Sequence, residues 1–269
     1  MKKMKNLLIC ALTTVAITSA AHGSVITLQD LNSVVEFNPA SQNGQFTWRV
    51  DGVDYMAKQW FWYRIGGAGP ESSVDTLNLL PPKVTNNNFN PGDDTLALRY
   101  LGSGFRIDIM FILTGTPWGS RWSDIAETIT IANTGPVALD FHFFQYVDLN
   151  LGLGQSDDTA WFPHNNAVKQ TTANGLVASE TVITPVPSHR EVKPVPITLN
   201  KLNDQLPTTL DGTSGPVTGD VGWAYQWDVT IPVGGAFQIS KDKQIVPEPA
   251  TTLFLVLGGL AVSRRRCRV

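Results

Sequence analysis

Apolar side chains recur at every second residue over most of this chain, and this alternation limits the fold more than any other feature. In FRIDIMFIL, residues 105–113, the odd-numbered positions are all apolar, whereas Arg106 and Asp108 lie at even-numbered ones. A period of two is typical of a β-strand with one buried face. The segments with the same period, or with a shorter strand-like composition, are SVITL, SVVEF, QFTWRV, QWFWYRI, LALRYL, DIAETITIAN, VALDFHFFQYVDLNL, VGWAYQWDVTI and AFQISKDKQI.

Turn signals separate these segments, as at Gly102-Ser103-Gly104 and at Asn133-Thr134-Gly135-Pro136. The sequence therefore predicts an all-β protein, an antiparallel two-layer β-sandwich with long irregular loops and little helix. Only LNKLNDQL, residues 199–206, reads as a helix, with Thr198 as a candidate N-cap and Pro207 as its stop. Two loop-rich stretches, 66–94 and 184–220, leave one domain as the expectation and a split near residue 185 as the alternative.

The first 23 residues have the pattern of a secretory signal peptide. Lys2, Lys3 and Lys5 precede an apolar run, and Ala21-His22-Gly23 supplies the small side chains that a signal peptidase accepts. We expect cleavage between Gly23 and Ser24, so that the exported domain comprises residues 24–245.

Residues 246–269 combine three features in a fixed order. Pro247-Glu248-Pro249 comes first, an apolar run over 250–262 follows, and Arg264, Arg265, Arg266 and Arg268 complete the tail. As a helix the run would span about 20 Å, short for a membrane core of about 30 Å. The arginine cluster favours the cytoplasmic side and acts as a stop-transfer signal. A hydrophobic C-terminal strand and an ordinary tail anchor are the alternatives.

This arrangement resembles the PEP-CTERM sorting domain over about the last 24 residues. The resemblance implies recognition by an exosortase of a Gram-negative bacterium, with Pro247, Glu248 and Pro249 as the sorting motif. It further implies a transient anchor in the inner membrane through the short transmembrane helix. The destination would be the cell surface or extracellular matrix, with extracellular polysaccharide as a partner in biofilm or floc formation.

The charge of residues 24–245 excludes nucleic acid as a partner. These residues carry 13 lysines and arginines against 22 acidic residues, a formal charge of −9, and such a surface repels polyanions. Cys10 and Cys267 lie in the signal peptide and the tail, so residues 24–245 contain no cysteine. A thiol nucleophile and a cysteine-bound zinc site are thereby excluded from this domain.

Catalytic motifs are absent: the sequence holds no G-x-S-x-G, H-E-x-x-H or P-loop. One strand, LDFHFFQYVDLN, places Asp140, His142 and Asp148 on the face opposite Phe141 and Phe143. Such a face can serve a glycosidase, which needs paired carboxylates. A solvated outer strand is the simpler interpretation.

Two other residue groups are candidates for ligand contact. Trp118, Trp122 and Trp161 fall in predicted loops and are candidate glycan contacts, whereas Trp60, Trp62, Trp223 and Trp227 are expected in the core. Asp157-Asp158 with Asp148 supplies oxygen ligands of the kind Ca²⁺ uses, although solvated charge is the simpler interpretation.

From the sequence we expect no catalytic residues, no cofactor and no bound metal. The leading expectation is a non-enzymatic, exosortase-sorted surface protein of an exopolysaccharide matrix. A carbohydrate-binding module that uses the loop tryptophans is the second hypothesis. A polysaccharide-active hydrolase or lyase, served by Asp140, His142 and Asp148, is the third.

Overall fold

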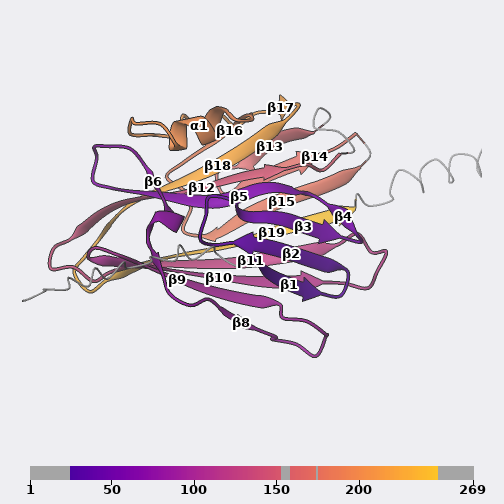
Figure 1. Cartoon of the computed structure of the whole chain (residues 1–269). Coiled ribbons are helices and arrows are strands. Elements are labelled where there is room, and N and C mark those ends of the chain that lie inside the picture. The colour runs from indigo at the N-terminus through magenta and orange to yellow at the C-terminus, as the bar shows by residue number, and fades with distance from the viewer. Residues whose placement is uncertain (1–24, 153–157, 174, 248–269) are drawn as a thin grey trace, which may run out of the picture.

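The computed structural model describes residues 25–152, 158–173 and 175–247, and these residues form two large, mostly antiparallel β-sheets. Figure 1 shows the sheets as two layers, with α1 (Ile197–Leu202) at one side of the molecule and β8 (Lys83–Thr85) at the other. The predicted antiparallel two-layer sandwich with little helix is confirmed. Pro247, the last described residue, ends the final strand.

The first sheet runs in the order β1-β2-β3-β5-β12-β18-β16, with the two-residue strands β4 and β6 paired to β3 and β5. Its strands are β1 (Ile26–Asp30), β2 (Ser33–Asn38), β3 (Gly44–Val50), β4 (Val53–Asp54), β5 (Met56–Ile65), β6 (Ser72–Ser73), β12 (Leu139–Leu149), β16 (His189–Pro194) and β18 (Val221–Ile231). All pairs are antiparallel except β3 with β5.

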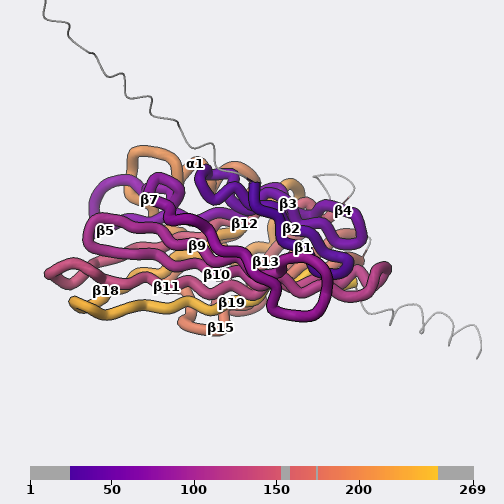
Figure 2. Tube along the Cα trace, turned by 60° about the horizontal axis from the view of Figure 1, so that its bottom comes forward, coloured from indigo at the N-terminus to yellow at the C-terminus, as the bar shows by residue number. Residues whose placement is uncertain are grey.

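The second sheet runs in the order β17-β13-β14-β15-β19-β11-β10-β9-β7, with β8 also paired to β9. Its other strands are β7 (Asn78–Leu79), β9 (Thr95–Gly102), β10 (Phe105–Gly115), β11 (Ser123–Asn133), β13 (Thr159–His164), β14 (Ala167–Thr171), β15 (Leu176–Thr184), β17 (Val217–Thr218) and β19 (Ala236–Pro247). The long strands β9, β10, β11 and β19 run side by side along the body, as the tube in Figure 2 shows.

Aromatic rings from both sheets fill the space between the layers. Phe37 of β2 lies 4.7 Å from Phe111 of β10, measured between ring centroids, and Phe61 of β5 stacks on Phe143 of β12 at 5.5 Å. Trp60, Trp62, Trp223 and Trp227 are each 0 or 1% exposed, so their predicted burial is confirmed. Trp223 and Trp227 lie between the layers, whereas Trp60 and Trp62 are buried on the outer face of β5, opposite Tyr146 and Phe144 of β12. Burial of such large rings is the main source of stability in a domain without disulfides.

A charged cluster is also buried between the sheets. Glu127 of β11, Glu180 of β15, and Lys241 and Lys243 of β19 form ion pairs with one another, and all four are at most 1% exposed. Amides of the first sheet contact the carboxylates: Gln59 donates to Glu127 and Gln145 to Glu180, each at 2.8 Å. The cluster therefore joins three strands of one layer to the other layer.

The segment between β16 and β17 covers the outer face of the first sheet. It contains α1, which begins two residues before the predicted helix and ends at Leu202 rather than at residue 206. The Asn203 side chain follows the helix and accepts a hydrogen bond from Trp62 Nε1 at 3.2 Å. This hydrogen bond fixes the end of α1 against β5.

Candidate functional site

The outer face of the first sheet is more buried than its sequence suggests. The alternation along β12 is as predicted, since Phe143 faces the second sheet and His142, Phe144 and Tyr146 face outward. However, Phe144 and Tyr146 are at most 1% exposed, so the interpretation as a solvated outer strand is wrong for most of this face. Parts of the two stretches that looked irregular fold over it, namely the chain around Glu71 and the segment between β16 and β17.

Arg64 of β5 holds these two stretches together. Its guanidinium pairs with the buried Glu71 and donates to the Thr208 carbonyl at 2.9 Å, and the Thr208 N–H in turn donates to Glu71 at 2.9 Å. The guanidinium also lies over the Phe144 ring, 5.8 Å from its centroid. Both covering segments are therefore fixed to the sheet by one ion pair.

At one end of this face, two imidazoles share one carboxylate. His142 Nδ1 lies 2.6 Å from Asp228 Oδ1, and His189 Nε2 lies 3.2 Å from Asp228 Oδ2. We call His142, His189 and Asp228 the histidine cluster. Gln226 Nε2 donates to Asp228 Oδ1 at 2.8 Å, and the Asp228 N–H donates to Ser188 Oγ at 3.0 Å, so the carboxylate is held in place.

Strand order produces the histidine cluster. The strands β12, β18 and β16 are neighbours, with His142 opposite Asp228 and His189 opposite Gln226. The sequence indicated His142 but missed His189 and Asp228, because no local pattern shows that β16 and β18 lie beside β12. His189 lies 47 residues after His142 in a proline-rich stretch, and no local pattern connects the two.

The histidine cluster is open to solvent at its edges. The side chains of His189 and Asp140 are 40% and 56% exposed, whereas that of His142 is 14% exposed. His142 Nε2 has no hydrogen-bond partner among the described residues and lies 3.8 Å from Asp140 Oδ1. Asp140, His142, Asp228 and His189 thus form a row of four titratable groups across three strands.

The chemistry of this row is that of general acids and bases. A neutral imidazole that donates from one nitrogen keeps a lone pair on the other, and histidine changes charge near neutral pH. The Asp228 carboxylate accepts a hydrogen bond from each imidazole ring. It therefore fixes which nitrogen of each ring points away from the carboxylate. Among the described residues, no group of three or more His, Cys, Asp or Glu side chains has an arrangement that can hold a metal ion.

Asp148 lies apart from the histidine cluster, at the other end of the same face. Six residues of extended strand separate it from His142, a distance of about 20 Å. Burial and the nearby Asp220 raise the pKa of Asp148 to about 7, against the opposing effect of Lys58. Neither Asp148 Oδ1 nor the Tyr146 hydroxyl has a hydrogen-bond partner in the described part of the chain. The three residues proposed for a hydrolase therefore do not form one site.

Asp158, one of the candidate calcium ligands, is separated from solvent. Asp158 is 2% exposed, and its Oδ2 accepts hydrogen bonds from the Leu151 N–H at 3.0 Å and from Gln170 Nε2 at 2.7 Å. Asp157 lies outside the described residues. Asp158 therefore has a role in fixing the start of β13.

The three loop tryptophans do not gather at one place. Trp118 is 73% exposed in the turn between β10 and β11, and Trp122 is half-buried in the same turn. Trp161 lies in β13, which is four strands away from β11 in the sheet, about 19 Å at the usual spacing. The Lys169 ammonium lies 5.6 Å from the Trp161 ring centroid. The structure therefore does not bring the three tryptophans together, and it places Trp161 in a strand rather than in the predicted loop.

The signals at the two ends of the chain fall almost wholly outside the described residues. Gly23, Ser24, Glu248, Pro249 and the cluster Arg264, Arg265, Arg266 and Arg268 are not described, and Pro247 is the last residue of β19. None of the helices in the described ranges is sufficiently long and apolar to cross a membrane.

Comparison with protein-family models and with curated proteins gives no match. Among solved structures, a protein described as an aldose 1-epimerase from Escherichia coli K12 is similar, with a TM-score of 0.55 and 10% identity over 83% of this chain and 99% of that chain. A galactose mutarotase related enzyme from Lactobacillus acidophilus has a TM-score of 0.51 and 8% identity, and covers 82% of this chain and 97% of its own.

A bacterial glucoamylase complexed with acarbose has a TM-score of 0.56 and 8% identity over 91% of this chain. The matching region is 35% of the glucoamylase chain, so this protein spans about a third of it. At these identities the likeness shows the fold alone, and that fold is shared with enzymes of carbohydrate chemistry.

These neighbours overturn the expectation of a non-enzymatic matrix protein. That expectation rested on the resemblance of the tail to a sorting domain and on the absence of catalytic sequence motifs, whereas several similar folds belong to proteins described as epimerases or mutarotases. An acid–base site of this kind has no sequence motif because its residues come from separate strands. The absence of a sequence motif therefore does not bear on whether residues from separate strands form a catalytic site.

Proposed function

We propose that this chain is a carbohydrate-processing enzyme that uses the histidine cluster for acid–base chemistry at the anomeric carbon of a sugar. The observation that carries the proposal is the pair of imidazoles held on Asp228, on a fold similar to those of an aldose 1-epimerase and a mutarotase-related enzyme. Interconversion of anomers needs a group that accepts a proton and one that donates a proton, and nothing more.

The reaction balances with the groups present. A basic nitrogen of the histidine cluster accepts the proton of the anomeric hydroxyl, and an acid of the same row donates a proton to the ring oxygen as the C1–O5 bond breaks. Rotation about C1–C2 and the reverse transfers close the ring with the opposite configuration. His189 is the imidazole that a sugar can reach, because 40% of its side chain is exposed. Asp140, at the other end of the row, is the exposed carboxyl.

The test is the rate of anomer exchange, measured by NMR over a panel of aldohexoses and aldopentoses. Replacing His189→Gln or Asp228→Asn should lower the enzymatic rate by a factor of about 100 or more, the usual contribution of general acid–base catalysis. His164→Gln is the matched control, since His164 is an exposed histidine of β13 outside the histidine cluster. No acceleration of any sugar by the unaltered protein would contradict the proposal.

We further infer that the enzyme is exported and sorted by its tail, with an exosortase as the processing partner and extracellular polysaccharide as its environment. The tripartite sequence of residues 246–269 supports this, as does the signal-peptide pattern of residues 1–23. The domain and the motif are also contiguous, because β19 ends at Pro247. A sugar-active domain in such a matrix would meet its substrate there.

A further inference from the structure

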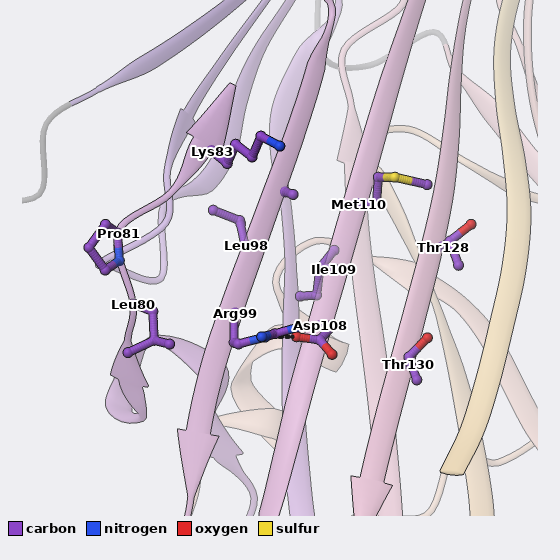
Figure 3. Close-up of a pocket in the computed structure, with 11 residues that line it drawn as sticks. Leu80, Pro81, Lys83, Leu98, Arg99, Asp108, Ile109, Met110, Thr128 and Thr130 are labelled. Atoms are coloured by element: carbon purple, nitrogen blue, oxygen red, sulfur yellow. Dashed lines mark hydrogen bonds and ion pairs between the residues drawn. The ribbon is translucent and has the colours of Figure 1, made fainter. Parts of the chain in front are cut away.

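The outer face of the second sheet carries a groove on the side of the sandwich opposite the histidine cluster. Its volume is about 580 Å³. Figure 3 shows Leu80, Pro81 and Lys83 along one edge, Met110 and Thr128 across the strands from them, and Arg99 joined to Asp108 in between. The volume lies within the range of about 300–1,000 Å³ that ligand sites occupy.

The strand register shows how these side chains are arranged. Lys83 lies opposite Ala97, Ala97 opposite Met110, and Met110 opposite Thr128, which makes one row across β8, β9, β10 and β11. The next row consists of Arg99, Asp108 and Thr130. Residues directly opposite in a sheet share a face, so the groove presents a cation, an apolar thioether and two hydroxyls together.

Lys83, Arg99 and Asp108 are the charged residues that line the groove, and Arg106 lies just outside this lining, two residues before Asp108 on β10. Arg99 Nε lies 2.5 Å from Asp108 Oδ1 and Arg106 Nε lies 2.8 Å from Asp108 Oδ2. One carboxylate thus balances two guanidinium groups, and Lys83 adds a third cation. The side chains of Arg99 and Arg106 are 51% and 35% exposed, and their terminal nitrogens make no hydrogen bond within the described part of the chain.

This local excess contrasts with the formal charge of −9 over residues 24–245. An acidic protein that keeps three cations around one groove favours an anionic ligand there. Guanidinium groups with free terminal nitrogens match planar carboxylates, to which arginine binds through two parallel hydrogen bonds. The exposed thioether of Met110 and the ring of Pro81 offer apolar contact, and Thr128 and Thr130 offer hydroxyls.

We propose that this groove binds sugar-acid units of an acidic polysaccharide. Arg99 and Arg106 hold the uronate carboxylates and Lys83 contributes further positive charge. Thr128 and Thr130 hydrogen-bond to sugar hydroxyls, while Met110 packs against the apolar side of a pyranose ring. The choice of a sugar over another polyanion rests on the proposed function, whereas the preference for negative charge rests on the groove itself.

Binding of the full chain to polygalacturonate, with dextran as the neutral polymer, tests this proposal. The double variant Lys83→Gln, Arg106→Gln should bind polygalacturonate at least about tenfold more weakly. Added salt should also weaken the binding of polygalacturonate to the unaltered protein. Arg49→Gln is the matched control, since Arg49 is an arginine of similar exposure paired with Glu36 on the other sheet. It should bind as the unaltered protein does.

Asp108→Asn supplies a test of opposite sign. Loss of this carboxylate frees both guanidinium groups, so binding of polygalacturonate should strengthen, whereas a merely structural role of Asp108 would weaken it. Equal binding of dextran, equal binding of polyglutamate, or no effect of the double variant would each overturn the proposal. Anomer exchange is measured on the same preparations, so failure of binding and failure of the proposed catalysis are distinguished.

Discussion

Asp140 and Asp148 lie on the same face of β12, yet their surroundings give them different properties. The side chain of Asp140 is 56% exposed, whereas Asp148 is 8% exposed. Burial and the charge of Asp220 raise the pKa of Asp148 to about 7, with Lys58 acting in the opposite direction. A carboxyl that keeps its proton to neutral pH makes the stability of the folded protein depend on pH.

The sign of this dependence follows from the raised pKa. The unfolded chain loses the proton near pH 4, while the folded protein keeps it to about pH 7, so stability should fall as pH rises through this window. The whole shift corresponds to about 4 kcal/mol as an upper bound. Between pH 5 and pH 8 the expected loss is about 2 to 3 kcal/mol.

Replacing Asp148→Asn should remove this loss. Urea unfolding at pH 5 and pH 8 measures the free energy of unfolding for both proteins. Relative to that of the unaltered protein, the free energy of unfolding of the variant should be higher at pH 8 than at pH 5. Asp124, whose pKa burial and the adjacent Asp242 also raise to about 7, is present in both proteins and does not affect the comparison. Identical pH profiles would show that Asp148 titrates normally.

The three strands β11, β15 and β19 carry the buried charged cluster. Their pairing depends on the charges of its two carboxylates and two ammonium groups cancelling each other. Burial alone would raise the pKa of Glu127, but Lys241 and Lys243 outweigh it and hold the pKa at about 2. This carboxylate therefore stabilises the fold above the pKa of the unfolded chain, and the contribution is lost as pH falls toward 2. Burial lowers the pKa of Lys243, against the attraction of Glu127.

Replacing Glu127→Gln should destabilise the protein by about 3 to 5 kcal/mol, because it leaves two buried lysines with one carboxylate. Urea unfolding at pH 7 gives the value. Glu36→Gln is the matched control, since Glu36 pairs with Arg49 at 3.1 Å and both side chains are partly exposed, so its loss should cost less than about 1 kcal/mol. Similar costs for the two variants would mean that the buried cluster adds nothing to the pairing of the strands.

Local pattern was sufficient for the strands whose inner face is wholly apolar, such as β10 with Ile107, Ile109 and Phe111. It missed β13, β14 and β15, where the buried positions include Gln170 and Glu180. Such strands lack hydrophobic alternation, and their polar groups are acceptable only because Asp158, Lys241 and Gln145 meet them in the fold. Lys241 and Gln145 lie on other strands and Asp158 lies just before β13, so a pattern read along one segment cannot reveal these partners.

Because a local pattern does not show which strands are neighbours, only part of the candidate site was predicted. Alternation placed Asp140 and His142 outward on one strand, and the structure agrees. The carboxylate that joins His142 to His189 comes from β18, and the second imidazole from β16. Strand order within a sheet depends on long-range pairing, so two of the three residues of the histidine cluster could not be found before the fold was known.

The sandwich as a whole presents two outer faces with different character. The chain's own segments cover most of the first sheet and leave the histidine cluster open at one end. The second sheet carries the groove that Lys83 and Arg99 line. The core separates the two faces by about 10 Å between backbones. A polymer held on the second sheet would therefore leave the histidine cluster open to small sugars, as the two proposals together require.

Such retention needs the protein outside the cell, which is the role we assign to residues 246–269. Protein recovered from the surface or medium of the producing bacterium should lack the arginine cluster, as measured by mass spectrometry of the C-terminal peptide. Replacing Arg264, Arg265, Arg266 and Arg268 by glutamine should prevent processing, because positive charge holds the short apolar run in the membrane. Replacement of the same four residues by lysine keeps the charge and should leave processing intact. An intact arginine cluster on exported protein, or normal processing of the glutamine variant, would contradict the assignment.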